Sequence, residues 1–418
     1  MALSGNKGEW SEIYVVLKLL ADKKLFSADR DMQKIATVFY PILKILREEF
    51  KDSSKVEYVV NGNIKIIDGK TQDQLLEVST REFIEQADAF FKILNEKKSS
   101  SFQMSEFEEF LNKIKIKTLK AKSEDKADIS VIVQDNMTNS ALPLTFSIKS
   151  LLGKNPTLLN PGKSTNFIYK ISHPENKKLD ISTFNKLTYS NTRQKGSSKI
   201  SKRLSDLKEM GFQINFCEIE SDNFQLNLEL IDTDLPSILS HMLLYKYELG
   251  ISKTSELLSK LQEENPLNYN LKKGHPFYIY KLSSLLYDYA LGMTPQKVWK
   301  GNYMTTGGII VVKNSGEALC YRIYDKNLFQ EYLLLETKFE QPSTGEDENN
   351  PGNPATNSGS VNNDDEDIED EAPNKKGKSK EYFFGWVYEE NEEYFIKLNL
   401  QIRFLTQTKK KNGSNSLF

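Results

Sequence analysis

Apolar residues near the start of the chain follow both helical and extended periods. They recur every three or four positions over residues 12–20, which predicts a helix. A second helix is expected over residues 32–50, where Pro41 would set a first turn or a kink. Alternating apolar residues around an Asn-Gly-Asn turn then predict a hairpin over residues 56–67.

Two further helical patterns cover residues 80–95 and 104–114, and Ser79 or Thr80 is a candidate cap for the first of them. We therefore interpret the N-terminal segment, residues 1–127, as mainly helical.

The pattern changes at Asp128 to alternation with a period of two. Extended runs over residues 129–133 and 142–148 flank a turn at residues 136–139, which predicts an antiparallel pair of strands. A second segment, residues 128–306, begins here, and its remainder is mostly helical. The clearest helical patterns in it cover residues 235–249 and 276–291.

The third segment, residues 307–418, is rich in extended patterns. It contains an insert, residues 341–380, with almost no large apolar residues, and such a composition favours disorder. We expect strands on both sides of this insert, over residues 309–312, 319–323, 383–388 and 393–404.

Composition excludes several classes of protein. The chain has 418 residues and two cysteines, too few for a disulfide scaffold or a zinc site built on four cysteines. No apolar run reaches the length of a membrane-spanning helix, and the first nine residues lack the apolar core of a signal peptide. We therefore expect a cytoplasmic protein without a membrane partner.

The formal net charge of -2 is an average over two unlike parts. The insert holds ten acidic residues and four lysines, so the rest of the chain holds 52 basic and 48 acidic residues. A mildly positive body is compatible with a polyanionic partner such as a nucleic acid.

Asp128, Ser147 and Lys149 form the sharpest local pattern of candidate chemistry. Asp128 begins one predicted strand and Lys149 ends the next, so an antiparallel pairing brings them to one end of the sheet. Ser147 and Lys149 are two positions apart and point to the same face. Such pairs also occur in sheets without a catalytic role. Together, however, the three side chains suit metal-assisted hydrolysis of a phosphodiester.

In this interpretation Asp128 binds Mg²⁺, which takes oxygen ligands, and Lys149 stabilises charge on the phosphate or orients the attacking water. One carboxylate is a weak Mg²⁺ site, so a second acid is expected. Glu12 is the first candidate and Glu9 the next, because both lie at the start of the first predicted helix and can share a face. The alternative is that both acids only cap that helix.

Two segments offer contacts to DNA. The loop over residues 154–166 is rich in amide, hydroxyl and lysine side chains, which commonly contact bases and phosphates. It lacks the first glycine of a nucleotide-binding loop, so we reject that interpretation. A basic strip over residues 186–210 could follow a phosphate backbone. The predicted DNA-binding residues are Asn160, Lys163, Ser164, Thr165, Asn166, Arg193, Lys195, Lys202 and Arg203.

Several long blocks of the chain resemble the HpaII-type restriction endonucleases and occur in the same order. They are GNKGEWSEIY (residues 5–14), FYPILKILRE (39–48), FSIKS (146–150), TLLN (157–160), TNFIYKI (165–171) and FIKLNLQIRF (395–404).

The resemblance implies an α/β (α+β) fold with a PD-(D/E)XK-like nuclease core, a mixed sheet flanked by helices. The additional helical and β-rich C-terminal regions would lie around this core. Asp128 and Lys149 match the family's catalytic positions, while Ser147 stands where the general nuclease pattern has an acid. The implied protein is a Mg²⁺-dependent Type II restriction endonuclease that cuts both strands at a short specific site. The family's namesake cuts CCGG.

The resemblance also implies double-stranded DNA as substrate and a methyltransferase in the same host that protects the same site. A palindromic target favours a homodimer, and a monomer that cuts the strands in turn is the alternative. Two other functions stay open: a non-catalytic DNA-binding protein derived from a nuclease, and an interaction protein that acts through its acidic insert.

Overall fold

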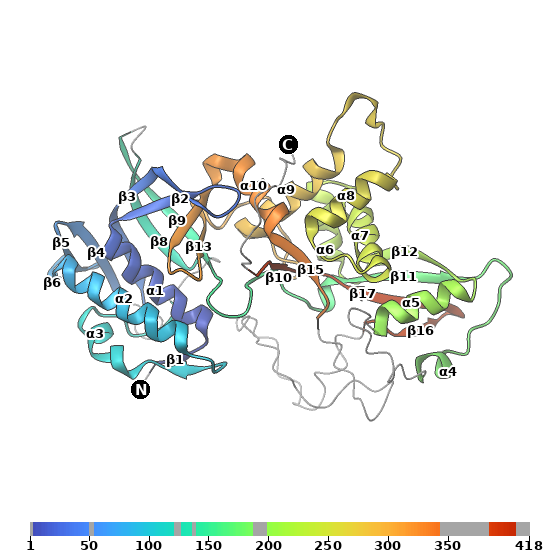
Figure 1. The fold of residues 1–418 in the computed structure, drawn as a ribbon, viewed down its shortest axis with the longest axis horizontal. Coiled ribbons are helices and arrows are strands. Elements are labelled where there is room, and N and C mark those ends of the chain that lie inside the picture. The colour runs from blue at the N-terminus through green and yellow to red at the C-terminus, as the bar shows by residue number, and fades with distance from the viewer. Residues whose placement is uncertain are drawn as a thin grey trace.

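The computed structural model describes residues 3–49, 54–120, 127–135, 139–186, 199–342 and 384–406. Figure 1 shows two parts side by side: a curled sheet with helices at the left, and helices with smaller sheets at the right. No helix among the described residues is both long and apolar enough to cross a membrane. Almost all of the predicted acidic insert 341–380 lies outside the described residues.

The left part is built on a nine-stranded mixed sheet, in the order β2-β14-β13-β9-β8-β3-β4-β5-β6. All three sequence segments contribute strands to it. The strands are β2 (Lys24–Ala28), β3 (Lys34–Glu48), β4 (Lys55–Asn61), β5 (Asn63–Asp68), β6 (Gln74–Val78), β8 (Ile129–Asp135), β9 (Ser140–Ser150), β13 (Gly308–Val312) and β14 (Ala318–Arg322).

This sheet curls until it closes on itself. Strand β2 pairs with β14 at one side and with β3 at the other, so six strands form a ring. Helix α1 (Lys7–Asp22) packs against β9, β2 and the neighbouring strands, and its side chains are buried almost all the way round. Helix α2 (Thr80–Glu96) covers α1, with the rings of Trp10 and Phe90 5.9 Å apart. A helix apolar on all sides requires such enclosure.

Smaller elements complete the left part. They are β1 (Ser4–Gly5), paired with β7 (Phe102–Gln103), the short η1 (Ser105–Phe107) and α3 (Glu108–Lys113).

Two hydrophobic cores lie on opposite faces of strand β13. Ile310 and Val312 belong to the core that surrounds α1, whereas Ile309 and Val311 belong to the core of the C-terminal part. Successive side chains of a strand point to opposite faces, so an unbroken apolar run predicts a strand buried on both sides. The sheet is therefore the wall shared by the two parts of the molecule.

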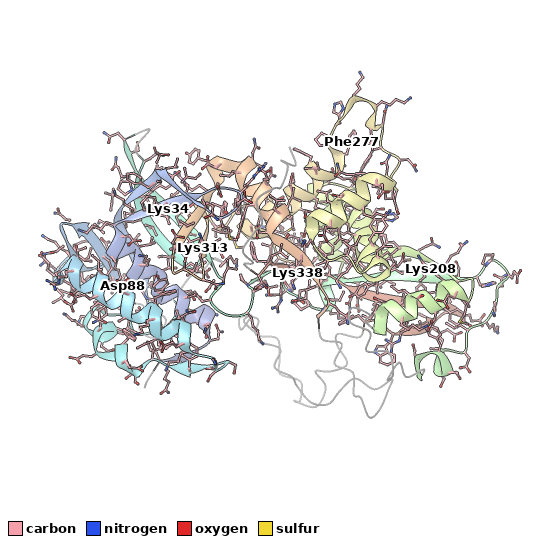
Figure 2. The ribbon with its side chains drawn as sticks, in the orientation of Figure 1. Lys34, Asp88, Lys208, Phe277, Lys313 and Lys338 are labelled. Atoms are coloured by element: carbon pink, nitrogen blue, oxygen red, sulfur yellow. The ribbon has the colours of Figure 1, made fainter. Side chains whose placement is uncertain are left out.

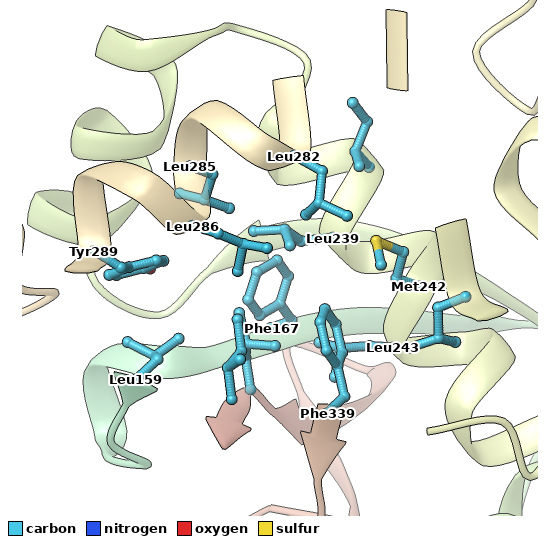
Figure 3. Close-up of a cluster of buried hydrophobic side chains, with 14 of the residues drawn as sticks. Leu159, Phe167, Leu239, Met242, Leu243, Leu282, Leu285, Leu286, Tyr289 and Phe339 are labelled. Carbon is cyan, nitrogen blue, oxygen red and sulfur yellow. The ribbon is translucent and has the colours of Figure 1, made fainter. Parts of the chain in front are cut away.

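The C-terminal part is a layer of helices over two smaller sheets. One sheet has the order β12-β11-β17-β16 and the other β10-β18-β15. Figure 3 shows their shared core, where Phe167 and Phe339 of the sheets meet Leu239, Leu282 and Leu286 of the helices. The strands are β10 (Thr157–Leu159), β11 (Asn166–Ser172), β12 (Gln213–Ile219), β15 (Thr337–Glu340), β16 (Val387–Glu390), β17 (Glu393–Asn399) and β18 (Gln401–Phe404).

The helices of this part are α4 (Ile181–Lys186), α5 (Lys199–Glu209), α6 (Asp222–Ile231), α7 (Leu235–Leu249), α8 (Thr254–Glu264), α9 (Phe277–Leu291) and α10 (Lys326–Glu336). Three single turns, η2 (Lys163–Thr165), η3 (Leu271–Lys273) and η4 (Ile323–Asp325), lie in its connections.

The predicted helix over residues 32–50 is wrong, because Lys34–Glu48 form the long strand β3. The segment is rich in β-branched and aromatic residues, which favour strands. Pro41 lies where β3 leaves its pairing with β2, and the next amide, that of Ile42, donates to the carbonyl of Lys23 at 2.9 Å. The N-terminal segment is thus mixed helix and strand rather than mainly helical.

Most other local predictions are confirmed. The hairpin is β4–β5, the predicted strand pair is β8–β9, and the N-terminal helices include α1 and α2, with Ser79 as cap of α2. The mixed sheet flanked by helices is also observed. Strands β10, β11 and β12 were not predicted: β10 lies in the segment interpreted as a loop, β12 in the region interpreted as mostly helical, and β11 largely between these two.

Candidate active site

Asp128 lies directly before β8, opposite Ser147 of β9. Its amide donates to the carbonyl of Phe146 at 2.9 Å, which fixes this pairing. The Ser147 hydroxyl donates to Asp128 Oδ2 at 3.1 Å, and the amide of Ile148 donates to the same oxygen at 2.5 Å. Oδ1 accepts no hydrogen bond from the described residues and is therefore available to a cation.

Lys149 follows two residues after Ser147 on the same face of β9. Ser147 pairs with Ile309 and Lys149 with Val311, and both partners belong to the C-terminal core. The two polar side chains therefore project toward the C-terminal part of the molecule. Lys149 is partly buried and makes no ion pair or hydrogen bond within the described part of the chain. An ammonium left without a counter-ion here suits an anionic ligand.

Helix α1 brings a second carboxylate to this end of the sheet. Asn6 caps the helix, and Asn6 and Glu9 form a reciprocal capping box. The helix is fixed to β9 by a hydrogen bond of 2.7 Å between the hydroxyls of Ser11 and Ser150. Glu12 follows Ser11, so this contact holds it beside the end of β9.

Glu12 and Asp128 are close enough to repel each other. Burial raises the pKa of the Glu12 carboxyl well above its usual range, and the charge of Asp128 raises it further. The charges of Lys120 and Arg47 act in the opposite direction. Glu12 has no hydrogen-bond partner among the described residues, so its ionised form is poorly stabilised unless a cation binds.

Two basic residues near Glu12 were missed as parts of this site. Lys120 lies 3.8 Å from Glu9, and Arg47 is buried with its Nε 2.6 Å from Glu49 Oε1. Arg47 was placed in a predicted helix, so its face could not be assigned. On a strand, the side chain of Arg47 points to the same side as the buried Ile45. Reading residues 34–48 as a strand would therefore have placed Arg47 on the face toward Glu12.

Asp128 and Glu12 are the two carboxylates of this site that could hold a metal ion. No group of three or more His, Cys, Asp or Glu side chains among the described residues is arranged to hold a metal. Mg²⁺ commonly binds to one or two carboxylates, with water and substrate phosphate as its other ligands. The free Oδ1 of Asp128 and the unpaired, destabilised carboxylate of Glu12 fit that requirement.

The predicted DNA-binding residues Thr165, Asn166 and Arg203 are buried. Asn166 donates to Glu220 at 2.8 Å and accepts from Asn399 at 2.7 Å. Thr165 and the backbone of Gly162 exchange hydrogen bonds of 3.1 Å. Asn166 thus links β11 to the ends of β12 and β17, and Thr165 closes the turn before β11, so the structure does not support a DNA contact at these positions.

Arg203 is buried against Trp386, with the guanidinium carbon 3.9 Å from the ring centroid, and it donates to the carbonyl of Gly385 at 2.7 Å. It holds α5 to the segment before β16 and is not accessible to DNA either.

The other predicted DNA contacts remain accessible or lie outside the described residues. Asn160 and Lys163 are exposed, and Ser164 and Lys202 are partly exposed. Lys202 is ion-paired with Asp206 on α5, the helix that carries the labelled Lys208 in Figure 2. Arg193 and Lys195 lie outside the described residues.

Comparison with known proteins identifies the family of the chain. Residues 6–350 match the family model of the HpaII restriction endonuclease. The chain is 37% identical over 403 residues to the Type II restriction enzyme HpaII of Haemophilus parainfluenzae, which covers 96% of this chain and 99% of that protein. No solved structure matches the chain. The chain therefore belongs to the HpaII restriction endonuclease family and is a Type II restriction enzyme, a site-specific deoxyribonuclease.

Proposed function

We propose that this protein cuts both strands of DNA at a short specific sequence in a Mg²⁺-dependent reaction at the end of strands β8 and β9. The observation that supports the proposal is the juxtaposition of two mutually repelling carboxylates, Asp128 and Glu12. The unpaired ammonium of Lys149 lies on the same strand as Ser147, which contacts Asp128. A metal ion would offset the repulsion, and a phosphate would neutralise the lysine.

In the proposed mechanism Asp128 and Glu12 would hold the metal. The chemistry that Mg²⁺ would supply there is polarisation of the scissile phosphate and easier ionisation of the attacking water. Ser147 and the amide of Ile148 orient Asp128 by hydrogen bonds to Oδ2 and leave Oδ1 for the metal. Lys149 stabilises the negative charge that develops on the phosphate, or orients the attacking water. The serine thus positions a ligand where the general nuclease pattern supplies an acid.

DNA would lie along the face of β9 that points to the C-terminal part. Asn160, Lys163 and Ser164 offer polar groups on the loop that follows β9. Lys202 offers a positive charge on α5, and Arg193 and Lys195 of the preceding segment belong to the same proposal. In the three-segment division, residues 1–127 supply Glu12, residues 128–306 supply the catalytic strands and DNA loop, and residues 307–418 carry the acidic insert. This core would be of the PD-(D/E)XK type.

CCGG is the target that family membership suggests, since it is the site of the family's namesake. As part of a restriction-modification system, the enzyme would act in the cytoplasm beside a methyltransferase of the same specificity. A palindromic target would favour a homodimer with one active site per strand.

The test is digestion of plasmid DNA by the purified protein with Mg²⁺ or with EDTA. We expect discrete fragments with Mg²⁺ only, and sequencing of the fragment ends will give the target and the cut position. Plasmid methylated within CCGG should resist cleavage. Cleavage in EDTA would contradict the role of Mg²⁺. An intact plasmid under every salt and metal condition would overturn the proposed function.

A further inference from the structure

A cavity of about 400 Å³ opens in the C-terminal part, away from the carboxylate pair. It lies between α6, α9, the segment 299–303 and the first residue of α10. Figure 1 labels α6 and α9 in that part of the molecule and α10 near its centre. Its size is at the lower end of the range for small-molecule sites. The lining residues used here are Leu230, Tyr287, Asp288, Trp299, Tyr303 and Lys326.

Asp288 lines the cavity as a buried acceptor. Its side chain is on α9, and the residue is 7% exposed. One carboxylate oxygen accepts a hydrogen bond of 3.0 Å from the Tyr303 hydroxyl, and the other accepts none from the described residues. Burial raises the pKa of this carboxyl to about 6. A buried carboxylate with an unused oxygen is suited to N–H donors of a ligand.

Aromatic side chains form the cavity walls. The ring of Tyr303 is 5.8 Å from that of Tyr287 and 6.4 Å from that of Trp299. The mouth is flanked by exposed apolar side chains, with Tyr280 67% and Leu230 60% exposed. Flat aromatic walls stack well on planar heterocycles, and nucleobases are the planar heterocycles that a DNA-cleaving enzyme meets.

Two lysines give the cavity mouth a positive charge. Lys326 lies over the Tyr287 ring, 5.2 Å from its centroid, and Lys300 is exposed. Neither forms an ion pair with another described residue. Lys281, in contrast, is already neutralised by Asp232 at 2.6 Å. The exposed lysines are therefore placed to meet a phosphate next to a base in the cavity.

The cavity wall is joined to the catalytic strand. The residues after Tyr303 are hydrogen-bonded to Thr145 of β9. The Thr145 hydroxyl donates to the carbonyl of Met304 at 3.2 Å and accepts from the amide of Thr306 at 2.9 Å. Thr145 precedes Ser147 by two residues, about 7 Å along the strand, on the same face. DNA held at the active site would therefore pass close to the cavity.

We propose that this cavity takes up a single nucleobase from the bound DNA, displaced from its duplex. Trp299 and Tyr303 would stack on the base, the free oxygen of Asp288 would accept from its amino group, and Lys300 or Lys326 would contact the adjacent phosphate. The chemistry selects bases with an exocyclic amino group, such as cytosine or guanine. The inference rests on the proposed DNA cleavage, and a free nucleotide would present the same chemistry.

The test uses the full-length Asp128→Asn variant, which is expected to bind DNA without cutting it. Duplexes carry the target found by sequencing, with an abasic site opposite each base in turn. A base opposite an abasic site has no pairing partner, so displacing it from the duplex costs less free energy. The affinity of the variant for DNA should therefore rise at least about tenfold when the abasic site lies opposite the displaced base. Asp288→Asn and Trp299→Ala should abolish this gain. The matched control is Glu264→Gln, because Glu264 also accepts from a tyrosine, Tyr245 at 2.6 Å, outside the cavity.

The outcomes separate the inference from the function on which it rests. Failure of the wild-type enzyme to cut any DNA would overturn the proposed function. Specific cutting without a gain at any abasic position, or with the same gain in Asp288→Asn and Trp299→Ala, would overturn the inference alone. In a second arm, dCMP and dGMP are added to the protein in increasing amounts while its tryptophan fluorescence is recorded. The Trp299→Phe variant shows whether the fluorescence change comes from Trp299. Binding of these nucleotides without a gain in the duplex arm would identify a free-nucleotide site and overturn a displaced base.

Discussion

Two polar clusters of this enzyme look equally functional in sequence but differ in how their side chains are paired. The active-site cluster consists of Glu12, Asp128, Ser147 and Lys149. The buried polar cluster consists of the buried Thr165, Asn166 and Asn399 with the partly buried Glu220 and Lys397. Both combine charged and hydroxyl groups near strand ends, with Glu12 supplied by helix α1, and the buried polar cluster also contains amides.

In the buried polar cluster the groups pair with one another. Glu220 accepts from Asn166 and forms an ion pair of 2.9 Å with Lys397, and Asn399 donates to Asn166 and to the carbonyl of Gly162. In the active-site cluster, Glu12 and Lys149 have no partner among the described residues, and Glu12 is repelled by Asp128. Polar groups that hydrogen-bond to one another stabilise the fold. A charged side chain left unpaired in a partly buried site can instead bind a ligand of opposite charge.

The largest expected effect is on catalysis. Asp128→Asn and Lys149→Ala should each lower the cleavage rate by at least about 10²-fold, because each removes a charge that acts on the metal or the phosphate. Thermal unfolding should change little. Lys70→Ala, at an exposed turn, is the matched control and should cut at the wild-type rate. Comparable cleavage by Lys149→Ala and wild type would remove Lys149 from the mechanism.

The reverse effect is expected in the buried polar cluster. Asn166→Ala removes one hydrogen bond from Glu220 and one from Asn399 in a buried site, so it should lower the free energy of unfolding by about 1–3 kcal/mol. Chemical denaturation measures this loss. Asn155→Ala removes an amide that donates to Thr406 at the surface and should cost less. If Asn166→Ala kept its stability and instead lost specific DNA binding, the assignment of this cluster to the fold would be wrong.

A smaller, pH-dependent effect is expected at Glu12. Its pKa is raised in the fold, so the folded state binds more protons than the unfolded state between the two pKa values. Stability therefore falls as pH rises from the usual carboxyl range through the folded pKa, and the full cost is present above it. Glu12→Gln should remove this cost and give a higher melting temperature at alkaline pH without metal.

Mg²⁺ adds a second readout at the same residue. Binding requires the ionised carboxylate, so Mg²⁺ should raise the melting temperature of the wild type more as pH increases. The increase should be reduced in Glu12→Gln and kept in Glu96→Gln, an exposed acid on α2. Equal Mg²⁺ responses in all three proteins would exclude Glu12 as a ligand.

The smallest effect concerns the surface lysines. Lys163→Ala should weaken DNA binding for all sequences alike and lower the slope of log affinity against log salt by about one. Lys202→Ala should have less effect, because Lys202 is closely paired with Asp206, whereas Lys163 lies 3.9 Å from Glu220, a carboxylate that Lys397 already binds at 2.9 Å. Titrations at several salt concentrations measure both slopes. A change in sequence preference in Lys163→Ala would indicate contact with a base instead.

Local sequence patterns were sufficient to predict the structure where residues close in the sequence also contact one another in the fold. The hairpin β4–β5, the cap of α2 and the pair β8–β9 depend on residues close in the chain, and Asp128, Ser147 and Lys149 were placed through that pair. The helix predicted over residues 32–50 was wrong because the spacing of apolar residues there fits both a helix and a strand. Pairing with β2 and β8 stabilises the strand. Arg47 was missed for the same reason.

The sequence by itself determined the family, the mixed helix-and-strand class and the strand pair that places Asp128 beside Ser147. Only the tertiary structure decided which polar residues are unpaired. Thr165, Asn166 and Arg203 have side chains typical of DNA contacts, but partners up to about 230 residues away in the chain bury and bind them. The burial and hydrogen bonding of a polar side chain depend on such distant residues, so they cannot be predicted from the local sequence pattern.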